Sequence, residues 1–319
     1  MERPVPEIEA RGIEHVMRAE LARGDAMAGT ILPILRHLIT NDDNSVFSDE
    51  IIARIRGMMT DLATQLTESL SQVSGDRGEN GESAPIDAVF HALIDNPLLL
   101  GHVHALAIEA QLGARLQTRL SLDPVLPPLL QSLIASPDAG TQALAMQVLA
   151  AQARFNQAQR RMRLSLAELP GDEFHAALIA FRSAQGADTK TGEHVVVAER
   201  SLRAGYDEGQ SRIGLLARLV HSMGEQATSA LAVTEAGVSL FVTALGLLGG
   251  QRRDTAILAT HESQLSRLAL LLRSAGLTPS AVEEQFFALH PQVTLPRGFD
   301  ALDKDEAAAI LSSGPLMAT

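Results

Sequence analysis

The chain has 319 residues, which is enough for one large domain or for two to three smaller ones with a sizeable core. Hydrophobic residues make up 46% of it but aromatic residues only 3%, so the core must be built from Leu, Ala, Ile, Val and Met, a composition that favours helices over strands. The net charge of −12 disfavours non-specific binding to nucleic acid, and the absence of cysteine excludes disulfides, thiolate metal sites and cysteine nucleophiles.

The sequence before residue 71 predicts helices near residues 8–23, 27–39 and 49–70. In the third, apolar residues recur every three or four positions on one face, which is the pattern of an amphipathic helix. The stripe consists of Ile51, Ile52, Ile55, Met58, Met59, Leu62 and Leu66. It is either part of a core or a seam to a partner. In the second case we expect a homodimer through Ile51, Ile55, Met58, Met59 and Leu62.

Residues 71–85 (SQVSGDRGENGESAP) are polar, rich in glycine and without periodicity, which is typical of a flexible linker. They are expected to divide the chain. An N-terminal helical segment (1–70) precedes the linker, and a helical repeat-like domain (86–290) follows it. The remaining residues, 291–319, form a tail with a short helix near 304–311.

After the linker, proline marks the starts of several predicted helices. A small polar residue precedes proline at Asn96-Pro97, Asp123-Pro124, Ser136-Pro137 and Thr278-Pro279. Each pair fits a helix N-cap followed by proline at the first helical position. Helices are predicted near 86–94, 98–120, 125–134, 139–163, 173–184 and 193–203, with several more up to residue 289. We therefore expect an all-α fold, either an irregular helical bundle or a short α-solenoid with HEAT-like helix pairs.

One internal similarity bears on that choice. The pairs Asn96-Pro97 and Ser136-Pro137 lie 40 residues apart, and Ala105 and Ala110 match alanines at the same offset. Forty residues is the length class of HEAT and armadillo repeats. Because no third copy keeps the register, an irregular bundle with one HEAT-like pair stays open beside a true solenoid.

Two stretches, residues 157–181 (QAQRRMRLSLAELPGDEFHAALIAF) and 270–286 (LLLRSAGLTPSAVEEQF), resemble a family of uncharacterised alphaproteobacterial all-helical, HEAT-like proteins. The resemblance covers under a fifth of the chain. It implies a helical, bacterial and cytoplasmic protein, and it assigns no catalytic or binding residue.

The common catalytic signatures are missing from the sequence. It contains no P-loop, no Gly-x-Gly-x-x-Gly and no Gly-x-Ser-x-Gly, and Leu265 stands where a zinc-protease helix beginning at His261 needs its second histidine. We therefore predict no catalytic residue and no cofactor.

Metal ligands are also poorly placed in the sequence. His102 and His104 are two residues apart, so on a helix they point in nearly opposite directions. His91 and Asp95 share a helix face, but no third ligand is identifiable. The acidic run 41–44 lacks the central glycine and final glutamate of a calcium loop. We expect no metal site.

The best candidate for a binding site is a basic cluster in this acidic chain. It consists of Arg154, Gln157, Arg160, Arg161 and Arg163. In a helix to residue 163, Arg154 and Arg161 would share a face, and guanidinium groups bind carboxylates and phosphates in a bidentate manner. The alternative is a solvated face that pairs with acidic neighbours.

These observations favour a non-enzymatic helical scaffold or regulatory module that binds another protein in the bacterial cytoplasm. The N-terminus (MERPVPEIEA) does not fit a secretory signal, and the longest apolar stretch, residues 238–250, is too short for a membrane helix. One alternative is a small-ligand sensor or enzyme built from scattered groups such as His91, Asp95 and His102. Another is nucleic-acid binding through the arginines, which the net charge disfavours.

Overall fold

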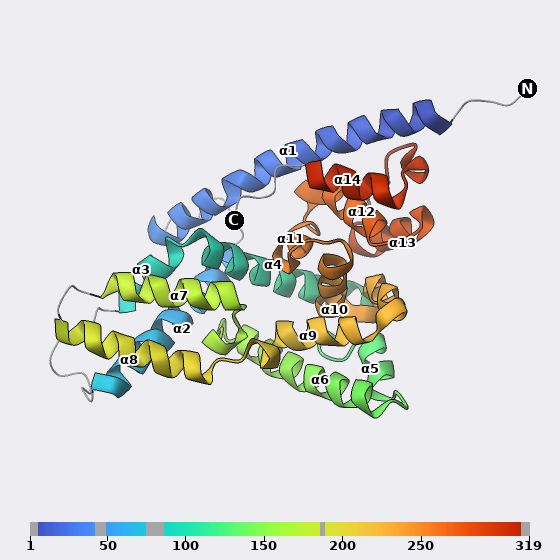
Figure 1. The fold of residues 1–319 in the computed structure, drawn as a ribbon. Coiled ribbons are helices and arrows are strands. Elements are labelled where there is room, and N and C mark those ends of the chain that lie inside the picture. Colours follow the sequence, from blue (N-terminus) through green and yellow to red (C-terminus); the bar gives the residue numbers. More distant parts are fainter. Residues whose placement is uncertain (1–5, 42–48, 75–85, 186–188, 314–319) are drawn as a thin grey trace, which may run out of the picture. The chain divides into compact units, whose positions relative to one another are not determined.

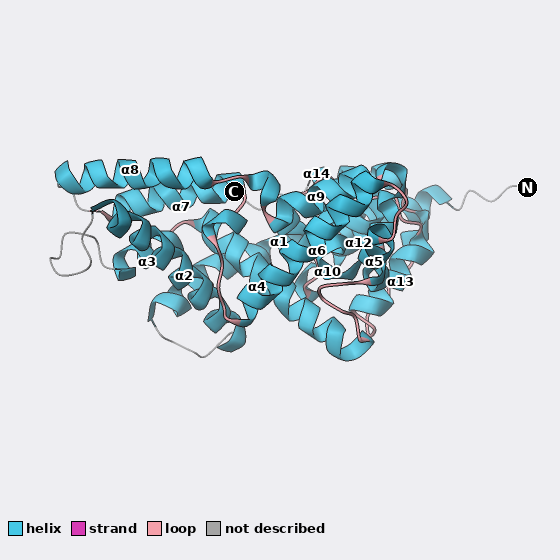
Figure 2. Ribbon diagram, turned by 90° about the horizontal axis from the view of Figure 1, so that it is seen from below, coloured by secondary structure: helices cyan, strands magenta, loops and turns pink. Residues whose placement is uncertain are grey.

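A computed structural model describes residues 6–41, 49–74, 86–185 and 189–313. All regular elements in these ranges are helices, so the predicted all-α fold is confirmed (Figures 1 and 2). The α-helices are α1 (Pro6–Asn41), α2 (Asp49–Ser74), α3 (Ile86–Ile94), α4 (Pro97–Leu120), α5 (Pro128–Ile134), α6 (Ala139–Arg160), α7 (Gly171–Ala184), α8 (Thr189–Gly205), α9 (Arg212–Ser222), α10 (Val233–Leu248), α11 (Arg253–Leu258), α12 (Leu265–Ser274), α13 (Pro279–Leu289) and α14 (Lys304–Ser313). The 3₁₀ helices are η1 (Leu166–Glu168), η2 (Glu208–Gln210), η3 (Gly224–Leu231), η4 (Glu262–Gln264) and η5 (Phe299–Ala301).

The helices form two compact units whose segments alternate along the sequence. Unit 1 comprises residues 1–31, 108–149 and 216–319, and unit 2 comprises residues 32–107 and 150–215. Of the predicted linker, residues 71–74 belong to α2, and residues 75–85 lie outside the described residues. The acidic run that begins at Asn41 also lies largely outside them, because the description of α1 ends at that residue.

Unit 2 is built around α2, which packs against α3 and α8, while α3 also contacts α7. Figures 1 and 2 both show α7 and α8 side by side. The apolar stripe of α2 is buried, with at most 8% of any of its seven side chains exposed. The stripe is thus core, the first of the two alternatives. A homodimer through Ile51, Ile55, Met58, Met59 and Leu62 would require this unit to open.

Unit 1 is built around α10, which contacts α5, α11, α12, α13 and η3. Its glycine Gly237 has a φ of 67° and lies against Pro127, where a Cβ would come within 2.9 Å of the proline Cβ. The apolar stretch 238–250 covers most of α10 and ends one residue after its C-cap, Gly249. No single described helix is long and apolar enough to span a membrane. The bent pair of η3 and α10 passes that test by length and composition only.

Two of the four predicted caps lie where the sequence places them. The side chain of Asn96 accepts hydrogen bonds from the backbone N–H groups of Leu98 and Leu99, at the start of α4. The hydroxyl of Thr278 accepts from Ala281 N, at the start of α13. In both cases the cap satisfies backbone donors that have no partner within the helix.

The other two proline-marked positions lead into turns before their helices begin. Asp123 accepts from the N–H groups two and three residues ahead, but α5 begins only at Pro128. Before α6, the backbone N–H of Thr141 donates to Asp138 rather than to Ser136. The carboxylate lies three residues before that donor, which is the spacing of a helix cap.

The two helices expected between residues 8 and 39 are one continuous helix, α1. The predicted break at Gly24 and Asp25 does not form. Both residues make tertiary contacts: Gln264 donates to the carbonyl of Gly24, and Arg267 donates to the buried carboxylate of Asp25. These contacts fix helical backbone at residues whose intrinsic preference for a helix is low.

Candidate functional site

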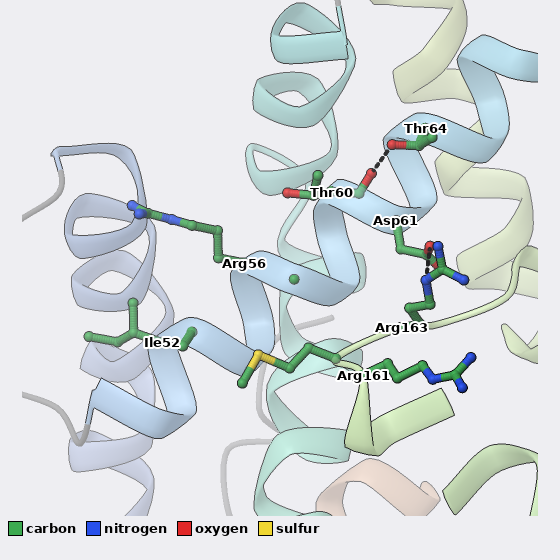
Figure 3. Close-up of a pocket in the computed structure, with 10 residues that line it drawn as sticks. Ile52, Arg56, Thr60, Asp61, Thr64, Arg161 and Arg163 are labelled. Atoms are coloured by element: carbon green, nitrogen blue, oxygen red, sulfur yellow. Dashed lines mark hydrogen bonds and ion pairs between the residues drawn. The ribbon is translucent and has the colours of Figure 1, made fainter. Parts of the chain in front are cut away.

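A hollow of about 690 Å³ lies in unit 2, between α2 and the segment that follows α6 (Figure 3). The residues that line it are Ile52, Ala53, Arg56, Gly57, Thr60, Asp61, Thr64, Arg161, Met162 and Arg163. Three arginines and one aspartate make this lining basic, although the whole chain carries a charge of −12. We call this hollow the arginine groove.

One wall of the groove exists because α6 ends at Arg160, three residues earlier than predicted. Met162 has a φ of 54°, a left-handed conformation that non-glycine residues rarely adopt. The N–H groups of Arg161 and Arg163 both bond to the carbonyl of Ala158. The chain therefore leaves the helix axis here, and Arg161, Met162 and Arg163 form a loop beside α2.

Gly57 allows α2 and this loop to touch. A Cβ at Gly57 would lie 2.6 Å from the Cβ of Met162 and 2.9 Å from its carbonyl oxygen. Both distances are too short for atoms that are not bonded. Glycine is thus the residue that fits at this point of contact.

Polar side chains of α2 hold the loop. Asp61 Oδ2 accepts from the backbone N–H of Leu164 at 3.1 Å, and Gln65 donates to the carbonyl of the same residue at 2.8 Å. Arg54 donates to the carbonyl of Gln159 at 3.0 Å. Residues 54, 57, 61 and 65 follow one another at spacings of three or four, so they share one face of α2. That spacing was visible in the sequence, but nothing in the sequence tells which segment the face contacts.

The structure brings only part of the predicted cluster into the groove. Arg161 and Arg163 line it, whereas Arg154, Gln157 and Arg160 are exposed and do not. The helix face that Arg154 and Arg161 were expected to share is not formed, because α6 ends before residue 161. A third arginine, Arg56, lines the groove from α2 and was not predicted.

The three arginines of the groove have different surroundings. Arg163 Nε lies 3.5 Å from Asp61 Oδ1, and 63% of the arginine side chain is exposed. Arg56 donates to the carbonyl of Ile39 at 2.7 Å. The guanidinium of Arg161 has no polar partner among the described residues. Figure 3 shows Arg161 and Arg163 on one side of α2 and Arg56 on the other, so the loop supplies the two arginines that can share a ligand.

The groove is chemically suited to binding an anion. Besides the arginines it presents the side chains of Thr60 and Thr64, and the hydroxyl of Thr64 donates to the carbonyl of Thr60. Guanidinium groups form charge-assisted hydrogen bonds with carboxylates and phosphates. The lining residues include no histidine, cysteine or serine.

The histidines considered as metal ligands, His91, His102 and His104, lie elsewhere in unit 2. His91 and Asp95 are exposed near the end of α3, and the carboxylate of Asp95 pairs with Arg36 at 2.7 Å. His102 and His104 are both buried in α4, at 1% and 4% exposed.

No protein family model, curated protein or solved structure matches this chain. The resemblance to an alphaproteobacterial helical family stays a prediction, because these comparisons do not bear on it.

Proposed function

We propose that this protein is a non-enzymatic helical module that binds another protein through the arginine groove. The observation that carries the proposal is a pair of arginines, Arg161 and Arg163, on a loop fixed to α2, with the guanidinium of Arg161 lacking a polar partner in the described ranges. Arginine is among the residues enriched in interface hot spots. Because hydrogen bonds from α2 already order the loop, binding costs less conformational entropy.

The charge distribution supports a specific contact rather than general attraction. The chain as a whole repels acidic molecules, since its net charge is −12. A basic groove on such a molecule attracts an acidic surface at one place, which favours one orientation of the partner. Nucleic acid is a poorer candidate, because its binding depends on many phosphate contacts and the global charge opposes them.

We further infer a scaffolding or regulatory role in the cytoplasm. The absence of cysteine fits a reducing compartment. The resemblance of residues 157–181 and 270–286 to alphaproteobacterial helical proteins adds support for a bacterial source.

Affinity capture followed by titration tests this function. Three baits are compared: the intact chain, Arg161→Glu/Arg163→Glu, and Arg154→Glu/Arg160→Glu. The last carries the same charge change on exposed arginines outside the groove. We expect a protein captured by the intact chain and by the control pair to be lost with the groove pair. The captured protein is then purified and titrated calorimetrically against each bait.

The expected result is an affinity at least about tenfold lower for the groove pair, in line with the loss of one or two interface hot spots. Equal affinity for all three baits would contradict the proposal. So would a screen in which no captured protein depends on the groove pair. Thermal melts of the three baits show whether the substitutions leave the fold intact.

A further inference from the structure

We infer that the groove takes an acidic peptide segment with at least two carboxylates, and that Asp61 is an internal competitor which this segment displaces from Arg163. The inference rests on the proposed function and specifies the partner's chemistry. It follows from the way in which Asp61 and the two loop arginines are bonded.

The contact between Arg163 and Asp61 is a weak one. It joins a single nitrogen, Nε, to Oδ1 at 3.5 Å, and the arginine side chain is 63% exposed. Asp61 is 19% exposed, so the pair is open to solvent on the arginine side, and a single long contact with such an exposed partner contributes little to stability. The two terminal nitrogens of Arg163 have no partner among the described residues, so they can meet an incoming carboxylate in the stronger bidentate geometry.

Asp61 does not depend on Arg163. Its other oxygen, Oδ2, accepts from the backbone N–H of Leu164 at 3.1 Å and from Gln65 Nε2 at 2.9 Å. Both bonds persist if Arg163 turns away, because they involve neither the arginine nor Oδ1. The carboxylate of Asp61 therefore has two separable roles, holding the loop and occupying Arg163 while no ligand is bound.

Arg161 supplies the second binding point. It lies two residues from Arg163 on the same loop and on the same side of α2 (Figure 3). In an extended peptide, side chains two residues apart lie on the same face, so two such carboxylates can each meet one of these arginines. Ala53 and Met162 add apolar surface to the lining, which a peptide can contact between its charges.

The groove favours carboxylates over phosphates. Asp61 stays in the lining after its displacement from Arg163, because the bonds to Leu164 and Gln65 keep it there. A fixed negative charge repels a dianionic phosphate more strongly than a singly charged carboxylate.

Fluorescence anisotropy with a labelled hexaglutamate peptide tests the inference. Four proteins are compared: the intact chain, Asp61→Asn, Glu193→Gln and Arg161→Glu/Arg163→Glu. Asn keeps an oxygen that can accept from Leu164 N but removes the competing charge. Glu193 is exposed on α8 and does not line the groove, so its substitution controls for the change in net charge.

We expect Asp61→Asn to bind hexaglutamate about three- to tenfold more tightly than the intact chain. Glu193→Gln should stay within about twofold, and the double arginine variant should lose at least about tenfold. Binding by Asp61→Asn no tighter than by Glu193→Gln would overturn the competitor role. Absence of hexaglutamate binding to the intact chain would overturn the acidic-peptide inference.

Competition separates a peptide site from a site for small anions. Citrate, inorganic phosphate and unlabelled hexaglutamate are added at equal concentration and ionic strength. Displacement by hexaglutamate alone supports the inference, and equal displacement by citrate or phosphate overturns it. The proposed function is judged separately, by the titration of the captured partner. A partner that needs the groove while hexaglutamate fails to bind would preserve the function and reject this chemistry.

Discussion

At the scale of single residues, the arginine groove depends on an unusual backbone at Met162 and on the missing side chain of Gly57. The left-handed conformation of Met162 turns the chain out of α6, and Gly57 gives the loop room beside α2. Neither residue can bind an anion through its side chain. Their effect is to fix the position of the loop backbone from which the side chains of Arg161 and Arg163 extend.

Replacing Gly57 by alanine tests this close contact. Alanine is the better helix former by about 1 kcal/mol, so the substitution would stabilise an open helix position. Here the new Cβ overlaps Met162, and forcing atoms into a packed site costs about 1–3 kcal/mol. We expect a net loss of stability of up to about 2 kcal/mol in urea unfolding, together with weaker binding of hexaglutamate.

Gly113 provides the matched control. It lies within α4, and a Cβ built there meets no atom within 4 Å. Gly113→Ala should therefore stabilise the protein by up to about 1 kcal/mol. If both alanine variants gained stability, the contact between α2 and the loop would be looser than the structure describes.

Tyr206, the one tyrosine of the chain, is a probe of unit 2. Its hydroxyl donates to the carbonyl of Leu169 at 2.8 Å, and its ring stacks on Phe174 with centroids 4.1 Å apart. Burial, followed by the negative charge of Glu208, raises the pKa of Tyr206 from 10.0 to about 12. Burial and nearby negative charges both disfavour the tyrosinate.

An alkaline titration followed by ultraviolet absorbance should show this raised pKa. Because the folded pKa lies above the unfolded one, the contribution to stability is complete below pH 10 and is lost as the pH rises toward 12. Ionisation in the folded protein should therefore lag behind that of the urea-unfolded chain. Tyr206→Phe removes the signal and serves as the blank. A midpoint near pH 10, with the helical circular dichroism intact, would contradict the expectation.

At the scale of helices, buried ion pairs join elements that the sequence does not connect. In unit 1 the guanidinium of Arg253, at the start of α11, makes two bonds of 2.9 and 2.8 Å with the carboxylate of Glu109 in α4. Arg253 Nε also donates to Thr243 of α10, and the hydroxyl of Ser239 donates to Glu109. The two charges that meet here come from residues 144 positions apart in the sequence.

Removing one partner of this pair should be costly. Arg253→Met removes a counter-charge and two hydrogen bonds from the buried carboxylate of Glu109, and breaking one side of a buried ion pair typically costs about 3–5 kcal/mol. Glu109→Gln/Arg253→Met should lose less, because no buried charge remains unpaired. Arg36→Met is the control, since its pair with Asp95 is more than half exposed and should contribute about 0–1 kcal/mol. Urea unfolding of the three variants measures these costs, and equal losses for Arg253→Met and Arg36→Met would count against the buried pair.

Helices are predictable from this sequence where local signals decide them. The range predicted for α3 agrees with the structure, and Asn96 caps α4 as expected. Prediction failed at α1, where tertiary contacts keep the helix continuous, and at the end of α6, where the left-handed conformation of Met162 accompanies the end of the helix. The groove likewise combines residues that local sequence identifies with residues that only tertiary packing brings in. Arg161 and Arg163 were identified in the sequence as members of a dense basic cluster. Arg56 joins them only through the packing of α2 against the loop.

At the scale of the whole molecule, the two units cannot be predicted from composition. A polar segment at residues 71–85 predicted a linker that divides the chain into a segment before it and a domain after it. In the structure, residues 1–31 belong to the same compact unit as residues 216–319. The buried pair of Asp25 and Arg267 is part of this association, and pairs so distant in sequence leave no local signal.

Deleting residues 1–31 should therefore disrupt unit 1. The deletion removes the buried side chains of Ile13, Met17 and Leu21, and it leaves Arg267, only 4% exposed, without its carboxylate. An unpaired buried charge costs about 3–5 kcal/mol and each lost core side chain about 2–5 kcal/mol, while domains are typically stable by about 5–15 kcal/mol. We expect the truncated chain to lose its cooperative thermal transition in circular dichroism.

The exposed face of the same helix supplies the control for that deletion. Val16 and Met27 are 44% and 51% exposed, so Val16→Ala/Met27→Ala in the full chain should shift stability by less than about 0.5 kcal/mol. A truncated chain that melts cooperatively at the temperature of the intact protein would mean that α1 is dispensable for unit 1. The expected outcome is that truncation abolishes the transition and the exposed-face variant changes little. That outcome would show that the buried face of α1 is needed to fold unit 1, in which it packs with residues from 216–319.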